Sequence, residues 1–171
     1  MGKNLWPGLF IRPEINKKEM SLEIVNQIMV TRGMILKSPG TMLFSMKSLM
    51  SKDSIVYKAL SEGPFKTKAL TPTYPWLDSE IPASPILNVD KHDNELKINW
   101  ETAGEEKPFW FVLYTRLNGV WTYEILPGST LTVIKDLNVK NISAVAISLV
   151  DRCGNESEKS MFDIKILPDP D

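Results

Sequence analysis

A proline-rich stretch near the middle of the chain limits what this sequence can fold into. Residues 70–85 read LTPTYPWLDSEIPASP, with prolines at positions 72, 75, 82 and 85. Each proline fixes its own φ and pushes the preceding residue towards an extended conformation, so neither a helix nor a central strand can run through the stretch. We therefore predict a stiff connector over residues 70–82 that separates two different parts. Its aromatic residues are too apolar for a solvated linker, and we expect Trp76 to dock on one of those parts.

The part before the connector, residues 1–69, alternates between strand and helix signals. Apolar runs predict buried strands at residues 5–12 and 41–46. Helical spacing predicts a helix over about 17–32 that ends at Gly33, and a second over about 49–61 with Asp53 as a candidate cap inside it. A strand that is buried on both faces needs neighbours on both edges. This β-α-β-α part is therefore predicted to be an incomplete α/β unit.

The first of these helices should bury one stripe of its surface. Its expected stripe comprises Met20, Ile24, Gln27/Ile28 and Thr31. Val25 and Met29 are expected to widen it. Seven of the eight methionines lie in residues 1–50, which suits irregular packing against a larger body.

The part after the connector, residues 83–168, changes to a period of two. Alternating or doubly apolar runs, separated by turn signals such as Asn118-Gly119, predict seven strands. Their expected ranges are 86–89, 96–100, 109–116, 120–126, 131–134, 142–150 and 161–167. Seven short strands in fewer than about ninety residues are typical of an all-β sandwich. The whole is thus predicted to be a two-part α+β chain.

Charge and composition exclude several classes of protein. The net charge of −1 argues against a nucleic-acid binder. It hides an asymmetry, because residues 1–78 carry 11 Lys/Arg against 6 Asp/Glu while residues 79–171 carry 9 against 15. Separate modules explain this, and electrostatic attraction between the halves is the alternative. The single cysteine excludes an internal disulfide, and no apolar run is long enough to span a bilayer.

The order of several short motifs resembles a known family. A Trp6-Pro-Gly8 strand, a helix with Gln27-Ile28 and Arg32, a Phe44-Ser45 strand, and Ala69-Leu-Thr-Pro…Pro75-Trp-Leu-Asp78 precede the sandwich. Together they are similar to the C-terminal part of the glycosyl hydrolase-like TIM-barrel proteins related to glycoside hydrolase family 10. These are exported bacterial proteins in which a fibronectin type III-like module follows the barrel. The resemblance covers nearly the whole chain.

The sandwich part resembles a fibronectin type III module in its own right. The phrase from Val145 to Ser157, VAISLVDRCGNES, looks like the F–G region of bacterial members, and Trp100 stands where the family has its strand-B tryptophan. Val145 is a departure, because the family often has a tyrosine there.

The resemblance implies an arrangement and a function. Residues 5–12 and 41–46 would be the last two barrel strands, with the first six absent, so that Met1 would be an internal methionine. The chain would be the non-catalytic C-terminal portion of an extracytoplasmic glycoside hydrolase-like protein acting on polysaccharide, and inactive alone. The rest of the barrel, or another protein chain, would pack on residues 1–69. The N-terminus MGKNLWPGLF lacks the apolar stretch of a signal peptide.

Candidate site residues lie at the ends of the predicted strands. Glycoside hydrolysis needs two carboxylates, and Glu14 is the carboxylate that directly follows a strand in the first part. We favour the alternative, that Glu14 belongs to the turn entering the helix, where negative charge suits the helix dipole. Arg12 and Ser45, with Lys47, are candidates for hydrogen bonds to sugar, and Trp76 for stacking. Solvation of the barrel rim and domain docking are the favoured alternatives.

The remaining candidates carry less chemistry. His92 lies in a charged loop without a second histidine, so no metal site is expected, and no cofactor is implied. Cys153 lacks a visible base to activate it. Five aromatic residues form a belt on two adjacent strands and offer either a carbohydrate-binding face or, as we favour, core and cross-strand packing. They are Phe109, Trp110, Phe111, Trp121 and Tyr123.

Two alternatives to the accessory portion of a hydrolase remain open. The aromatic belt favours a carbohydrate- or protein-binding module that acts alone. The open strand edges of the first part favour a structural or assembly protein.

Overall fold

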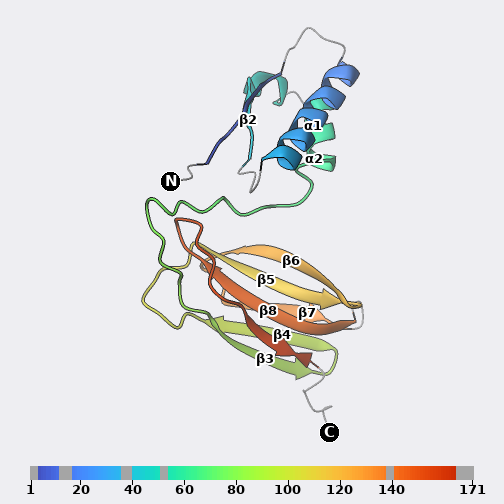
Figure 1. Cartoon of the computed structure of the whole chain (residues 1–171). Coiled ribbons are helices and arrows are strands. Elements are labelled where there is room, and N and C mark those ends of the chain that lie inside the picture. The colour runs from blue at the N-terminus through green and yellow to red at the C-terminus, as the bar shows by residue number, and fades with distance from the viewer. Residues whose placement is uncertain (1–3, 12–16, 36–39, 51–53, 138–140, 165–171) are drawn as a thin grey trace. The chain divides into compact units, whose positions relative to one another are not determined.

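The computed structural model describes residues 4–11, 17–35, 40–50, 54–137 and 141–164. The chain divides into two units, Met1–Pro72 and Thr73–Asp171. The first contains two strands and two helices, and the second contains strands and turns (Figure 1). The predicted order of β-α-β-α followed by seven strands is confirmed.

The first unit is built on two parallel strands. Its elements are β1 (Gly8–Phe10), α1 (Lys17–Met34), β2 (Met42–Phe44), the 3-10 turn η1 (Met46–Ser48) and α2 (Ile55–Glu62). β1 and β2 pair in parallel, with Leu9 opposite Leu43 and Phe10 opposite Phe44. A connection through a helix is what a parallel pair requires.

One face of this strand pair packs on the helices. Its core consists of five buried residues with Leu9, Val25, Leu43 and Leu49 packed against them: Ile11, Ile24, Ile28, Val56 and Leu60. The end of α1 is tied to the segment after α2, because Arg32 Nη1 donates to the Pro64 carbonyl (2.8 Å) and its guanidinium lies over the Phe65 ring.

Several details of the first unit differ from the prediction. Both strands are three residues long, and within the described residues each pairs only with the other. Gly33 lies inside α1, which ends at Met34. Met29 is exposed, although it was expected to widen the buried stripe. Helix α2 begins at Ile55, where Ser54 Oγ accepts from the Tyr57 amide (3.1 Å). Asp53 and the side chain of Met20 lie outside the described residues.

The second unit is a sandwich of two antiparallel sheets (Figure 1). The three-stranded sheet has the order β3-β4-β7 and the four-stranded sheet the order β6-β5-β8-β9. The strands are β3 (Ile86–His92), β4 (Glu95–Glu101), β5 (Trp110–Leu117), β6 (Val120–Pro127), β7 (Thr132–Asp136), β8 (Ile142–Val150) and β9 (Ser160–Asp163). This is the architecture of immunoglobulin-like and fibronectin type III modules.

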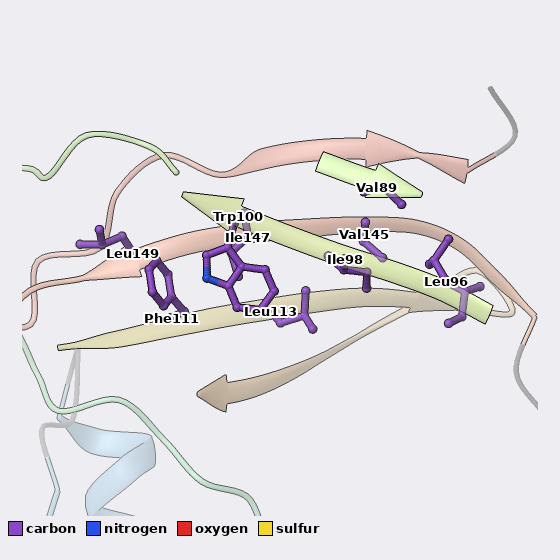
Figure 2. Packing of buried hydrophobic residues seen from close by; sticks show 10 residues of the cluster. Val89, Leu96, Ile98, Trp100, Phe111, Leu113, Val145, Ile147 and Leu149 are labelled. Carbon is purple, nitrogen blue, oxygen red and sulfur yellow. The ribbon is translucent and has the colours of Figure 1, made fainter. Parts of the chain in front are cut away.

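The sandwich core lies between the two sheets. Trp100 on β4 is 1% exposed and meets the ring of Phe111 on β5 edge-on, at 5.6 Å between centres. Figure 2 shows Trp100 beside Phe111, Leu113 and Ile147. The predicted face of Val145, Ile147 and Leu149 on β8 is buried here. The other face of β8 is also buried, at Ala144, Ala146, Ser148 and Val150, so this strand does not show a simple period of two.

The turns and open sides of the sandwich are specified by polar residues. Asn118 and Gly119 join β5 to β6 with φ values of 49° and 83°, the positive angles that a two-residue hairpin turn needs. Lys135 on β7 pairs with Glu124 on β6, so this ion pair links the two sheets at one side.

The first and last strands of the sandwich differ slightly from their predicted ranges. β3 continues to His92, and β9 ends at Asp163, with residues 165–167 outside the described part.

Candidate functional site

Two aromatic side chains stand on the outer face of the four-stranded sheet. Side chains alternate between the faces of a strand. Because Phe111 and Leu113 of β5 point into the core, the outward positions on β6 are those paired with Tyr114 and Arg116. They hold Tyr123 and Trp121, which are 43% and 44% exposed.

A polar cluster lies beside these rings, and we name it the Glu156 cluster: Tyr114, Ser148, Glu156 and Lys159. Tyr114 Oη and Ser148 Oγ both donate to Glu156 Oε1, each at 2.7 Å. Lys159 Nζ lies 3.7 Å from the same oxygen and 4.9 Å from the centre of the Tyr114 ring. One carboxylate oxygen thus gathers two hydroxyls and an ammonium group from three segments of the chain.

Backbone pairing holds Glu156 over the sheet. Val150 at the end of β8 forms an isolated antiparallel bridge with Glu156. The next residue, Ser157, donates its amide to the Leu149 carbonyl and accepts from the Leu149 amide through its hydroxyl. Glu156 therefore lies on the outward side of the sheet, as Val150 does. Moving it away from the sheet would break the backbone bridge to Val150 and the hydrogen bonds between Ser157 and Leu149.

The cluster gives Tyr114 an unusual titration. Burial, together with the Glu156 carboxylate, raises the pKa of Tyr114 to about 12, whereas an unfolded tyrosine titrates near 10. The folded state thus binds the Tyr114 proton more tightly than the unfolded state does. The protonated hydroxyl therefore adds to the free energy of unfolding in full below about pH 10, and this contribution is lost as the pH rises towards about 12. We expect urea unfolding to show this loss in the parent and not in Tyr114→Phe. Parallel pH profiles for the two proteins would contradict this assignment.

The aromatic belt predicted from the sequence divides into core and surface. Phe111 is fully buried, as the favoured interpretation required. Phe109 is 45% exposed, contrary to that interpretation, and it packs edge-on against Trp110. Trp121 and Tyr123 are exposed, and Tyr123 packs against Tyr114 at 6.5 Å between ring centres.

The connector is held by the turn between β8 and β9. The Tyr74 amide donates to the Cys153 carbonyl (2.9 Å), and Asn155 Nδ2 donates to the Asp78 carbonyl (3.3 Å). Trp76 stacks edge-on against Tyr74 at 5.4 Å and remains 39% exposed. Backbone hydrogen bonds of Tyr74 and Asp78 thus hold the connector, and the ring contact of Trp76 is with Tyr74 of the connector itself.

That turn is rigid because its polar groups satisfy one another. Asp151 is buried, and its two carboxylate oxygens accept from the amide and the side-chain nitrogen of Asn155, at 2.8 and 2.9 Å. Partial desolvation and the carboxylates of Asp151 and Asp78 raise the pKa of the Cys153 thiol. The thiolate is therefore disfavoured, which agrees with the lack of a nucleophile signal in the sequence.

The other sequence candidates are not brought together in the described part of the chain. Arg12 and Glu14 lie outside the described residues. Ser45 is exposed and precedes η1 without a capping hydrogen bond from its side chain, and Lys47 lies exposed within η1. His92 is exposed at the end of β3.

Metal and membrane signals are absent from the residues that the structure describes. Those residues contain no group of three or more His, Cys, Asp or Glu side chains that could hold a metal ion. Neither described helix has the length and apolar character needed to cross a bilayer.

The sequence drew attention to Trp121 and Tyr123 as part of the aromatic belt, although core packing was the favoured interpretation, and it missed the Glu156 cluster. Tyr114 and Glu156 are 42 positions apart. Glu156 belongs to the Val145–Ser157 phrase, but nothing in that phrase points to Tyr114 as its partner. The rings could be found because Trp121 and Tyr123 alternate on one strand.

Comparisons with known proteins give matches among solved structures. No family model and no curated protein matches the chain. The fibronectin type III domain of human collagen XX is 14% identical over 56% of this chain and 99% of its own, with a TM-score of 0.40. That of human contactin 1 is 13% identical over 65% and 95%, with a TM-score of 0.35.

A bacterial enzyme is also among the matches. The spore cortex lytic enzyme SleM of Clostridium perfringens is 19% identical over 48% of this chain, with a TM-score of 0.39. The match covers 27% of that enzyme, so this chain corresponds to about a quarter of its length. Similarities this low do not indicate what the chain binds or does.

Proposed function

We propose that this chain is the non-catalytic C-terminal portion of an exported bacterial glycoside hydrolase-like protein that acts on polysaccharide. In this proposal residues 1–69 are the last two βα units of a barrel, residues 70–82 are the connector, and residues 83–168 are an accessory sandwich module. Extracytoplasmic location of the parent protein is part of the proposal.

The observation that carries the proposal is the bare face of the β1-β2 pair. The helices pack on the side of Leu9 and Leu43. On the opposite side, Phe10 and Phe44 are 50% and 48% exposed, with their ring centres 5.2 Å apart, and Met42 is exposed beside them. Parallel strands occur almost only in sheets that are covered on both faces. The exposed apolar face is therefore typical of a sheet fragment that further strands or another protein surface would cover.

A barrel supplies what the first unit lacks. In a (β/α) barrel, helices cover the outer side of each strand, and the inner side is packed by residues from the other strands. Leu9 and Leu43 then face the helix layer, and Phe10 and Phe44 face the barrel interior. Helix α1 also exposes apolar side chains away from the core, which further strands and helices would cover: Leu22, Met29, Val30 and Met34.

The proposal assigns no catalysis to this chain alone. Hydrolysis of a glycosidic bond needs a pair of carboxylates, and the strand ends of the first part offer Glu14 alone. A partner carboxylate would have to come from elsewhere in the parent protein. The second candidate function, assembly with another protein chain, is favoured by the same bare face.

Replacing Phe10 with lysine tests the role of the bare face. We expect the unmutated chain to bind a hydrophobic dye and to self-associate, because it exposes apolar surface and, among the described residues, the outer edges of β1 and β2 have no partner strand. Phe10→Lys should reduce both and keep the helical circular dichroism, since this ring is not part of the buried core. Light scattering and dye fluorescence measure the change.

Leu9→Lys is the matched control, because it places the same charge on the opposite face of the same strand. We expect it to abolish the helical signal, since Leu9 packs against the buried core. An unmutated chain that is a monodisperse monomer and binds no dye would contradict the proposal.

A further inference from the structure

We propose that the outer face of the four-stranded sheet binds a neutral polysaccharide, with Trp121 and Tyr123 stacking on sugar rings and Glu156 accepting a sugar hydroxyl. The inference deepens the proposed accessory role, since it gives the sandwich a ligand class and a site. It depends on residues of the second unit only.

The two rings have a suitable arrangement for a chain of sugars. Trp121 and Tyr123 are alternate residues of β6, so they lie on the same face, about 6.8 Å apart along the strand. Both are exposed by more than two fifths. The apolar faces of sugars pack on aromatic rings, and tyrosine and tryptophan also offer a polar group at the ring edge. Two rings in line along an edge strand can contact successive units of one extended chain.

Glu156 supplies a fixed acceptor next to the rings. The three contacts that hold its carboxylate, from Tyr114, Ser148 and Lys159, all converge on Oε1. Within the described part of the chain, Oε2 makes none of these contacts, and the Glu156 side chain is 29% exposed. A carboxylate that is oriented by three donors on one oxygen presents the other at a defined place. Hydrogen bonds to a charged acceptor are the stronger kind.

Lys159 adds a donor on the same face. Its ammonium group has three N–H donors and is 48% exposed, although it lies near Glu156 and the Tyr114 ring. A donor and an acceptor side by side match a sugar hydroxyl, which both donates and accepts. These groups fix orientation, while the rings supply contact area.

The charges of this face favour a neutral ligand. Arg116 is paired with Trp121 on β6 and with Ala144 on β8, and Ala144 is paired with Asp163 on β9. Arg116 and Asp163 therefore lie on the same outer face as Trp121. With Glu156 and Lys159, the charged side chains that pairing and contacts place on this face, among the described residues, are two acidic and two basic. A nucleic acid would need a basic excess, and an acidic polymer would be opposed by the two carboxylates. A neutral polysaccharide meets neither obstacle.

Affinity electrophoresis of the full chain tests the inference. Native gels would contain mixed-linkage β-glucan, galactomannan or starch as neutral polymers, and polygalacturonate as the acidic one. We expect retardation by at least one neutral polymer and none by polygalacturonate. Trp121→Ala should weaken the binding by at least about tenfold, the usual effect of removing an aromatic anchor.

Two further variants make the result specific. Glu156→Gln keeps an oxygen for Tyr114 and Ser148 but turns the other position into a donor, so it should weaken binding while the melting temperature stays close to that of the parent. Trp76→Ala removes the other tryptophan of the second unit that is exposed to a similar degree, and it should leave the affinity intact. Loss of binding in Trp76→Ala with retention in Trp121→Ala would overturn the assignment.

Other results of the electrophoresis would also decide whether this face binds a neutral polysaccharide. Binding of none of the neutral polymers, or of polygalacturonate alone, would overturn the inference. Either result would leave the barrel proposal standing, because that proposal depends on the first unit and is tested separately. Equal affinities of the parent and Trp121→Ala for a neutral polymer would exclude this face as the site.

Discussion

Replacing Trp100 with alanine is expected to destabilise the sandwich by about 3–5 kcal/mol, the usual cost of deleting a large aromatic side chain from a core. Trp100 is 1% exposed and packs edge-on against Phe111 between the two sheets. The cavity would lie at the centre of the core, where both sheets contribute side chains and neither can collapse fully. Urea unfolding followed by tryptophan fluorescence measures the loss.

Trp100→Phe is the matched control for this prediction. The indole Nε1 of Trp100 is buried and has no hydrogen-bond partner among the described residues, and leaving such a donor unpaired costs about 1–3 kcal/mol. Phenylalanine loses volume but removes that unpaired group, so we expect a much smaller destabilisation than with alanine. Equal destabilisation by both variants would contradict this account of the core.

Replacing Ile28 with alanine should unfold the first unit and leave the sandwich folded. Among the described residues, Ile28 is fully buried in a core of five buried side chains. The change costs about 2–5 kcal/mol, and a unit of this size has little stability to spare. Both described helices lie in the first unit, so far-ultraviolet circular dichroism reports its unfolding. We expect the helical signal to be lost while the unfolding transition of the sandwich stays in place.

The neighbouring residue supplies the control. Met29 is exposed on the same helix, so Met29→Ala should keep the helical signal. Ile28→Val should fall between the two, because it removes a single methylene. Simultaneous loss of the sandwich transition in Ile28→Ala would contradict the division into two units.

The sandwich was largely predictable because its sequence alternates with a period of two. Strands such as Leu96–Trp100 carry apolar residues at every second position, and Asn118-Gly119 specifies its turn locally. The ends of strands were predicted less well. β3 extends through charged residues to His92 because its partner β4 offers backbone groups that far, which is a tertiary effect with no local signal.

The first unit was predictable in order and less so in detail. Gly33 was expected to end the helix, but α1 runs to Met34, and the Ile35 amide still donates to the Thr31 carbonyl (3.0 Å). Met29 fits the apolar stripe in a helical projection, yet it lies exposed. An apolar pattern shows which residues would be buried in a complete body, and the described part of the first unit covers only one side of α1.

The candidate site shows the same limit. Trp121 and Tyr123 could be found, since alternation on one strand places them together. The Glu156 cluster could not, because it joins β5, β8 and the segment before β9, and its carboxylate is positioned by an irregular bridge with Val150. Contacts between residues 42 positions apart depend on the fold and leave no local pattern.

The central claim is that the first unit is part of a larger α/β body. The most direct test is to read the coding sequence upstream of Met1, in frame, in the source genome. The proposal predicts about six further βα units there, as an eight-stranded barrel requires. A start site at Met1 preceded by an in-frame stop, with no βα pattern upstream, would contradict it and favour an assembly role for the bare face of β1 and β2.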